Sequence, residues 1–219
     1  MNRYPKVTIG KCATVLPGVL PSDKKKLPPY SYLAIQQGLR SSAFSGEFSS
    51  EKGEQPYTYT YTAIQPGQLT PDGLSGESMV ILRDTPCSDE QHLRPGDVLI
   101  KRLNPDCAVV FEGSCDCIVA SANIFIIRPG RDLDSKYLSF LLEKSKLLQR
   151  VSQLSGVGTT VAALTVAQIE GGIIPLPSMR QQKILGELWA LSKKRERLLR
   201  DLTLENDRLM RALCGKQYQ

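Results

Sequence analysis

Residues 155–191, SGVGTTVAALTVAQIEGGIIPLPSMRQQKILGELWAL, decide how this chain is organised. The run GGIIPLP is apolar and closes with two prolines, which predicts the last strand of a folded domain. Ser178 follows, with Gln181 three residues later, and this spacing predicts a capping box that opens a helix. We therefore expect a folded domain over residues 1–177 and a helix from residue 178 onward.

The predicted helix carries apolar residues every three or four positions, close to the 3.5-residue repeat of a coiled coil. The seam consists of Ile184, Leu188, Leu191, Leu198, Leu202 and Leu209, interrupted by Arg195 and Glu205. A helix over 178–213 would be about 54 Å long at about 1.5 Å per residue, too long to be buried on a domain of this size. We expect it to project and to pair with another helix, leaving residues 214–219 as a tail. Arg195 and Glu205 either pair across the seam or face solvent in a slightly different register.

The first two-thirds of the chain show strand patterns. YTYTYTAI (residues 57–64) alternates tyrosine and threonine with a period of two. Five further apolar runs between Ser78 and Pro129, SMVILRD, DVLIKR, CAVVF, CIVAS and NIFIIRP, imply a curved sheet or partial barrel. Leucines at helical spacing follow in residues 132–154, with Asp134 as the expected N-cap. The predicted fold class is α/β (α+β): a mixed sheet with packed helices, followed by a long coiled-coil helix.

Composition narrows the class of protein. With 41% hydrophobic and 23% charged residues in 219, the chain has ordinary globular composition, which argues against a disordered or fibrous protein. No signal-peptide pattern and no run of roughly 18 apolar residues occurs, so we expect a cytoplasmic chain without a membrane partner. Residues 1–177 contain 18 Lys and Arg against 17 Asp and Glu, whereas residues 178–219 contain 10 against 5. The basic excess of the helix suits nucleic acid or an acidic partner.

Two loops resemble catalytic motifs incompletely. LPPY (residues 27–30) lacks the polar first residue that amino-methyltransferases of nucleic acids use, and no glycine-rich cofactor loop follows a strand. GVGTT (residues 156–160) lacks both the lysine of a phosphate loop and the third glycine of a dinucleotide loop. Its backbone N–H groups and the hydroxyls of Thr159 and Thr160 suit contact with a DNA phosphate, and a purely structural turn is an equal alternative.

The cysteines and the single histidine do not form a convincing metal motif. Cys107, Cys115 and Cys117 lie near Cys87 and His92 in sequence, but the Cys-x-Cys spacing lacks the usual gap and has no matching second pair. Free thiols are the favoured alternative to zinc. A single histidine argues against most general-base mechanisms that rely on histidine, and no group of side chains in the sequence forms a recognisable catalytic motif. We therefore expect no enzyme activity, cofactor or metal.

Four stretches together resemble a known family. They are YPKVTIGKCATVLPGVLP (residues 4–21), LRPGDVLIKR (93–102), VASANIFIIRPGRDLDSKYLSFLL (119–142) and LSGVGTTVAALTVAQIEGGIIPLPSMRQQKIL (154–185). In this order they resemble one half of the DNA-specificity subunit of type I restriction-modification enzymes. The opening stretch resembles the junction between that family's target recognition domain and its spacer helix.

The resemblance implies a non-catalytic, sequence-specific DNA-binding subunit. Its domain would read a half-site of double-stranded DNA, and its helix would pack against a second helix and dock modification methyltransferase subunits. S-adenosylmethionine and ATP belong to other subunits, and restriction or translocase subunits are further possible partners. Family members carry two recognition domains and two helices, so this chain would be a half-subunit that forms a homodimer, the partner of a different half, or a fragment. A stand-alone DNA-binding or phage-derived interaction protein, and an unrelated enzyme, are the alternatives.

Candidate DNA-binding residues follow from the chemistry of phosphate contacts. Lys24, Lys25 and Lys26 form the densest basic loop, and Lys101 and Arg102 end a strong strand. Tyr57, Tyr59 and Tyr61 offer hydroxyl groups. A solvated turn and core aromatic side chains are the respective structural alternatives.

Overall fold

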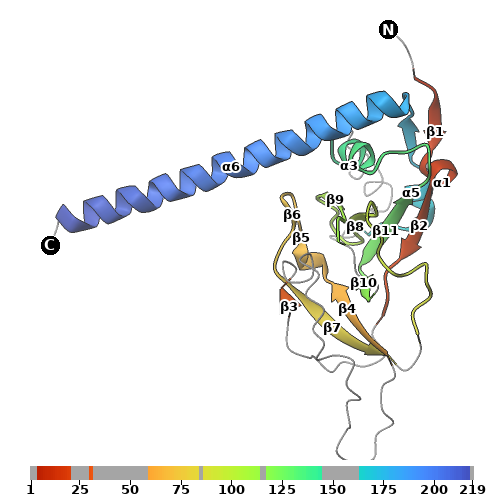
Figure 1. Cartoon of the computed structure of the whole chain (residues 1–219), viewed down its shortest axis with the longest axis horizontal. Helices are drawn as coiled ribbons and strands as arrows, with labels where there is room; N and C mark the ends of the chain where they lie inside the picture. The colour runs from red at the N-terminus through yellow and green to blue at the C-terminus, as the bar shows by residue number, and fades with distance from the viewer. Residues whose placement is uncertain are drawn as a thin grey trace, which may run out of the picture.

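The chain folds into an α/β domain from which one long helix projects (Figure 1). This computed structural model describes residues 4–20, 30–31, 59–83, 86–113, 117–144 and 163–217. The projecting helix is α6, Met179–Gln217, about 58 Å long at about 1.5 Å per residue. It begins where the sequence predicts and continues to Gln217, past the expected end at Leu213. No helix in the described ranges is long and apolar enough to cross a membrane.

Two four-stranded sheets form the domain. The first has the order β2-β11-β8-β9 and is antiparallel throughout, with β2 at Ala13–Pro17, β11 at Ile124–Pro129, β8 at Val98–Lys101 and β9 at Ala108–Val110. The second has the order β10-β4-β7-β3, with β10 at Ile118–Ala120, β4 at Tyr59–Ile64, β7 at Glu77–Arg83 and β3 at Tyr30–Ser31. β10 pairs with β4 in parallel, which makes this sheet mixed.

Shorter elements complete the domain. β1 (Lys6–Thr8) pairs with β12 (Ile173–Pro175), and β5 (Leu69–Thr70) forms a hairpin with β6 (Gly73–Leu74) after the 3₁₀ turn η1 (Pro66–Gln68). The helices are α1 (Ile9–Cys12), α3 (Ser135–Lys144) and α5 (Val166–Glu170). The predicted N-cap of α3 is confirmed, because the Asp134 carboxylate accepts a hydrogen bond from the Tyr137 N–H at 2.9 Å.

The first sheet is buried on both faces. Along β11, Ile124 and Ile126 join a core cluster with residues of β4 and β10, while Phe125 and Ile127 join another cluster with α3 and α5. Alternate residues of a strand point to opposite faces, so one face packs against the second sheet and the other against the helices. The sequence-predicted α/β class with packed helices is confirmed, and the mixed strand pairing lies in the second sheet. The five runs between Ser78 and Pro129 are divided between two sheets, because strands apolar on both faces need a layer on each side.

A buried ion pair closes one rim of the first sheet. Asp97 is 1% exposed and accepts two hydrogen bonds at 2.8 Å from the Arg128 guanidinium, at the end of β11. Arg128 also donates to the backbone carbonyls of Glu90 and His92. The pair therefore fixes the segment before β8 to β11, and neither partner can be removed alone without leaving an uncompensated group.

We predict that Asp97→Ala lowers the free energy of unfolding by about 3 kcal/mol, because it leaves the Arg128 guanidinium largely buried without its carboxylate. Urea unfolding followed by circular dichroism measures this loss. Asp132→Ala, at an exposed aspartate of a nearby loop, is the matched control and should stay within about 0.5 kcal/mol of wild type. Equal stability of the two variants would contradict the role given to the pair.

Candidate nucleic-acid and partner-helix surfaces

The start of α6 is fixed by two glutamines. Gln181 accepts hydrogen bonds from the backbone N–H and the hydroxyl of Ser178, at 3.2 and 3.0 Å, which confirms this arm of the predicted capping box. Gln182 is 1% exposed. Its amide donates to the carbonyls of Asp132 and Pro177 at 2.9 and 3.0 Å and accepts from the Asp134 N–H at 3.0 Å. These bonds join the first turn of α6 to the loop that precedes α3.

A glycine lets α6 approach α3 closely. A Cβ atom at Gly186 would lie 2.8 Å from the Lys136 Cβ and the Tyr137 backbone nitrogen, closer than real side-chain contacts. One turn on, the Trp189 ring packs against Phe140 with centroids 5.9 Å apart. The small residue followed by a large one seats the helix in one position on α3.

Ion pairs flank this contact. Lys136 Nζ lies 2.7 Å from Glu187, and this hydrogen bond raises the pKa of Lys136 in spite of partial burial. Lys193 Nζ lies 2.8 Å from Glu143, whose carboxylate also accepts the Ala108 N–H at 2.8 Å. Because β9 is the edge strand of its sheet, Glu143 both covers that edge and links it to α6.

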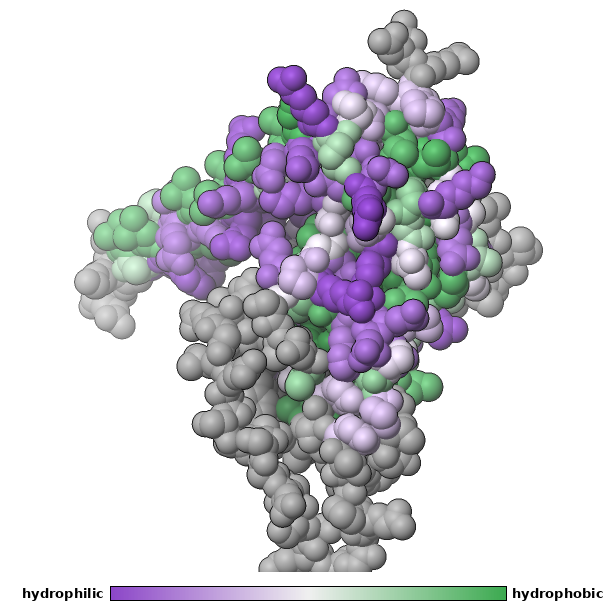
Figure 2. Space-filling view, turned by 45° about the vertical axis from the view of Figure 1, so that its right-hand side comes forward, coloured by the Kyte–Doolittle hydropathy of each residue, from purple (hydrophilic) through white to green (hydrophobic). Residues whose placement is uncertain are grey.

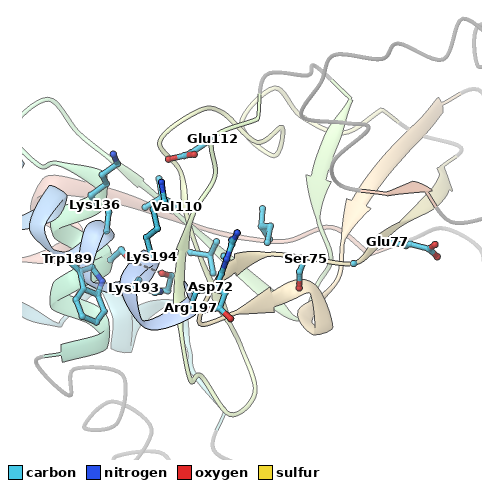
Figure 3. A pocket seen from close by; sticks show the side chains of 17 residues that line it. Asp72, Ser75, Glu77, Val110, Glu112, Lys136, Trp189, Lys193, Lys194 and Arg197 are labelled. Carbon is cyan, nitrogen blue, oxygen red and sulfur yellow. Dashed lines mark hydrogen bonds between the residues drawn. The ribbon is translucent and has the colours of Figure 1, made fainter. Parts of the chain in front are cut away.

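One further ion pair joins α6 to the domain, two helical turns after Lys193. The Arg200 guanidinium pairs with Asp72 at the tip of the β5–β6 hairpin. Between this pair and α3 lies a cavity of about 830 Å³, bounded by the hairpin, β9, α3 and α6 (Figure 3). Lys194 and Arg197 line it together with Glu112, so cations and carboxylates face the same space. The cavity therefore has no single sign of charge that would select an anion or a cation.

The opposite side of α6 is apolar and exposed. Ile184, Leu188, Leu191, Leu198, Leu202 and Leu209 are between 51% and 60% exposed. The first three follow Gln182, Gly186 and Trp189 by two residues, about 200° round a helix, and so point away from the domain; the other three continue the same heptad positions. In Figure 2 green surface follows the outer edge of the projecting part of α6, with purple beneath it. The sequence-predicted seam is thus a continuous exposed stripe.

Of the predicted DNA-binding residues, Lys101 and Arg102 are described most fully. Lys101 Nζ lies 2.9 Å from the Asp106 carboxylate. Burial raises the pKa of Asp106, but hydrogen bonds from Lys101 and Cys107 outweigh it and hold the pKa below its ordinary value. The Arg102 side chain is exposed, and its backbone bonds to Asn123 and Leu164 at 2.8 Å. The Arg102 side chain is therefore more available for contact with a ligand than the Lys101 side chain is.

Tyr59 and Tyr61 on β4 face a core cluster. Tyr61 is 6% exposed and its hydroxyl accepts the Cys87 N–H at 2.9 Å, while Tyr59 is half-buried against the same core cluster. Lys24, Lys25, Lys26, Tyr57, Thr159 and Thr160 lie outside the described residues. Ala163 and Leu164, shortly after the Gly/Thr stretch, pair with Leu103 and Arg102. Arg102 and Leu103, just after β8, therefore lie beside Ala163 and Leu164.

Of the described cysteines, Cys87 and Cys107 are buried, Cys12 is partly buried, and Cys117 and Cys214 are exposed. Burial, and then the nearby Asp106 carboxylate, raise the pKa of Cys107 to about 12. Cys115 lies outside the described residues. Within the described ranges no three His, Cys, Asp or Glu side chains group as a metal site. A thiol with such a pKa stays protonated near neutral pH and is a poor nucleophile and metal ligand.

Sequence reasoning missed the residues that hold α6 in place, chiefly Gln182, Gly186 and Glu143. A glutamine and a glycine four residues apart, at the start of an otherwise leucine-rich helix, are the signal that was available for the first two. Nothing local marks Glu143, because its role depends on β9 and α6 meeting the same face of α3.

Together the domain and the helix define an α/β module with one projecting helix, and solved structures of the same architecture exist. A chain from a structure that describes complex assembly and conformational transition of the type I restriction-modification system has a TM-score of 0.64 and 16% identity, covering 97% of this chain and 44% of that chain. The HsdS subunit from Thermoanaerobacter tengcongensis has a TM-score of 0.60 and 16% identity, covering 96% and 47%. The type I restriction-modification S subunit from M. genitalium has a TM-score of 0.52 and 11% identity, covering 94% and 43%.

The chain therefore has the fold of type I restriction-modification S subunits, as the sequence resemblance predicted. It spans less than half the length of these solved structures. No protein-family model matches the sequence, and no curated protein matches it.

We predict that Gly186→Ala loosens α6 from α3. The new Cβ clashes with the Tyr137 backbone nitrogen and the Lys136 Cβ, and overpacking of this kind costs about 1–3 kcal/mol, more than the gain of up to about 1 kcal/mol in helix propensity. Urea unfolding should show lower stability, and the emission of Trp189, the single tryptophan, should shift to the red. Gly67→Ala, where no atom lies within 4 Å of the new Cβ, is the control and should leave both unchanged. Wild-type stability and emission of Gly186→Ala would show that the close approach is not required.

Proposed function

We propose that this chain is a DNA-specificity subunit of a type I restriction-modification system, which directs methyltransferase and restriction subunits to a bipartite target. One observation carries the proposal: an α/β domain is joined by a buried amide and ion pairs to a long helix whose outer face is apolar, in the fold of solved S subunits. Such a chain binds and positions other molecules and has no chemical step of its own.

The two parts of the chain have separate tasks in this proposal. Residues 1–177 read a half-site of double-stranded DNA, and residues 178–213 act as the spacer helix that pairs with another helix and docks methyltransferase subunits. S-adenosylmethionine belongs to those subunits. The ion pairs and the buried amide at the junction support this division, because they hold the domain at a fixed angle to the helix.

The DNA-facing surface includes the end of β8. Arg102 supplies an exposed guanidinium, which suits either a phosphate oxygen or the edge of a guanine. Lys24, Lys25, Lys26, Thr159 and Thr160 are further candidates from the sequence. Lys101, held by Asp106, contributes less. Tyr57 and Tyr59 remain candidates, although the half-buried position of Tyr59 on the core side of β4 favours packing.

The helix supports a homodimer. Six apolar side chains that are each more than half exposed form one stripe, which a second copy would cover with the same stripe. Antiparallel pairing would put one recognition domain at each end, so that two identical domains read two identical half-sites in opposite orientation. The target is then an inverted repeat whose spacer depends on the helix length.

Co-expression with a type I methyltransferase subunit from the same genome tests the function. Sequencing of methylated genomic sites should reveal one bipartite motif, and its two halves should be inverted copies of each other. Absence of motif-specific methylation, with both subunits expressed and co-purified, would contradict the specificity role.

We predict that replacing Lys101 and Arg102 together by alanine weakens DNA binding. It should also lower the slope of log K against log salt by about 0.9 for each phosphate interaction that the substitution removes. Arg102→Ala alone should account for most of the change, because Lys101 already pairs with Asp106. Fluorescence anisotropy at several salt concentrations measures both quantities, and Lys183→Ala on α6 is the control. Unchanged affinity and slope in a folded double variant would remove the end of β8 from the DNA surface.

We predict that the protein is a dimer at micromolar concentration and that Leu191→Asp with Leu198→Asp makes it a monomer, because the aspartates place charge in the apolar stripe. Sedimentation velocity distinguishes the two states. Leu204→Asp is a close control, since Leu204 is 56% exposed but lies off the stripe, and it should leave the dimer intact. A monomeric wild type, or a methylation motif with unrelated halves, would instead favour a different second half.

A further inference from the structure

The exposed stripe of α6 contains two charged residues of opposite sign. Arg195 lies between Leu191 and Leu198, and Glu205 lies between Leu202 and Leu209, all at three- and four-residue spacing. Both charged side chains are exposed, and Arg195 forms no salt bridge with any residue that the structure describes. A partner helix on this stripe must therefore cover a cation and an anion as well as leucines. Covering either charge without an opposite charge would be costly.

We propose that the occupant is a second copy of this chain in one antiparallel register, in which Arg195 of each copy lies opposite Glu205 of the other. The inference rests on the dimer proposed above and specifies its geometry. The twofold axis then passes at the level of Arg200, midway between the two charges. Residues equally far from Arg200 face one another, so Leu191 meets Leu209 and Leu198 meets Leu202. From Leu188, which lies opposite Ala212, to Leu209, every apolar position of the stripe faces an apolar one.

Other arrangements of the same two helices lack this match. Moving one helix by a heptad places Arg195 opposite Leu198 in one direction, or Glu205 opposite Leu202 in the other. A parallel pair aligns equal positions, which places Arg195 against Arg195 and Glu205 against Glu205. Only the antiparallel register centred on Arg200 pairs both charges with their opposites, so charge complementarity selects it.

The contacts within one chain are compatible with this register. Arg200 faces its own domain and pairs with Asp72, so it does not occupy the seam. Glu205 is near Arg208 on the same helix, but both side chains are more than 60% exposed, and such a pair contributes little that a new partner must replace.

The two charged layers select the partner and orientation more than they add stability. Buried ion pairs seldom stabilise an interface beyond apolar residues of similar size, whereas a polar residue in a coiled-coil core specifies register. The chain should therefore favour its own copy over helices with an uninterrupted apolar seam, because those would leave both charges unpaired.

Charge reversal tests the register directly. Arg195→Glu and Glu205→Arg should each weaken homodimerisation at least about 100-fold, since each creates two layers of like charge, which cost several kcal/mol. Mixing the two variants should restore a one-to-one heterodimer, because both layers then pair opposite charges again. The double variant Arg195→Glu, Glu205→Arg should form homodimers like wild type. Sedimentation velocity and native mass spectrometry of full-length chains measure all four species.

Arg211→Glu and Asp207→Arg are the matched controls, because both residues are exposed on α6 but lie off the stripe, and they should leave the dimer unchanged. Recovery on mixing also shows that the single variants are folded. Single variants that dimerise as tightly as wild type, or that fail to recover on mixing, would overturn the register while leaving the dimer in place. A monomeric wild type would overturn the proposed dimer, and neither result touches the DNA-specificity role, which the methylation motif tests.

Discussion

The buried amide of Gln182 sets the relation between domain and helix. Its carbonyl and both of its N–H bonds are satisfied by backbone groups of Asp132, Asp134 and Pro177, on two separate segments of the domain. A buried amide that lost any of these partners would be left unsatisfied, at a cost of about 1–3 kcal/mol. The first turn of α6 is therefore held from two sides, and Gly186 and Trp189 then seat the next turns on α3. The direction in which the helix leaves the domain follows from these contacts.

Because the direction of α6 relative to the domain is fixed, the rest of the helix can act as a spacer. After Lys193, the ion pair between Arg200 and Asp72 joins α6 to the domain. The apolar stripe on the outer side of α6 is exposed from Ile184 to Leu209. A helix held at one end and free along its outer face acts as a spacer: whatever pairs with the stripe is placed at a set distance from the recognition domain. In the proposed dimer, the register of the two helices and the length of each together determine how far apart the half-sites lie.

The sequence predicted those features that depend on local pattern. The strand runs, the start of α6 at the Ser178–Gln181 pair, the Asp134 cap and the exposed seam were all visible as spacing or composition. The division of the strands into two sheets was not, because β8 and β11 show only that they are apolar on both faces and not what lies against them. The roles of Gln182 and Glu143 depend on segments distant in sequence. The pairing of Lys101 with Asp106, in the loop that follows β8, was likewise not predicted, and the DNA contact of Lys101 stays a prediction.

The orientation of the two helices in the proposed dimer can be measured through the native Cys214. Cys214 is exposed on α6 and lies fourteen residues beyond Arg200. Spin labels on Cys214 of both copies, in a variant in which Cys12, Cys115 and Cys117 are replaced by serine, give one distance by pulsed electron paramagnetic resonance. Antiparallel pairing centred on Arg200 predicts a separation of about 42 Å along the helices, from twice fourteen residues at about 1.5 Å each. Parallel pairing would place both labels at the same level on the outer sides of the two helices, about 20 Å apart across the pair, and that result would contradict antiparallel pairing.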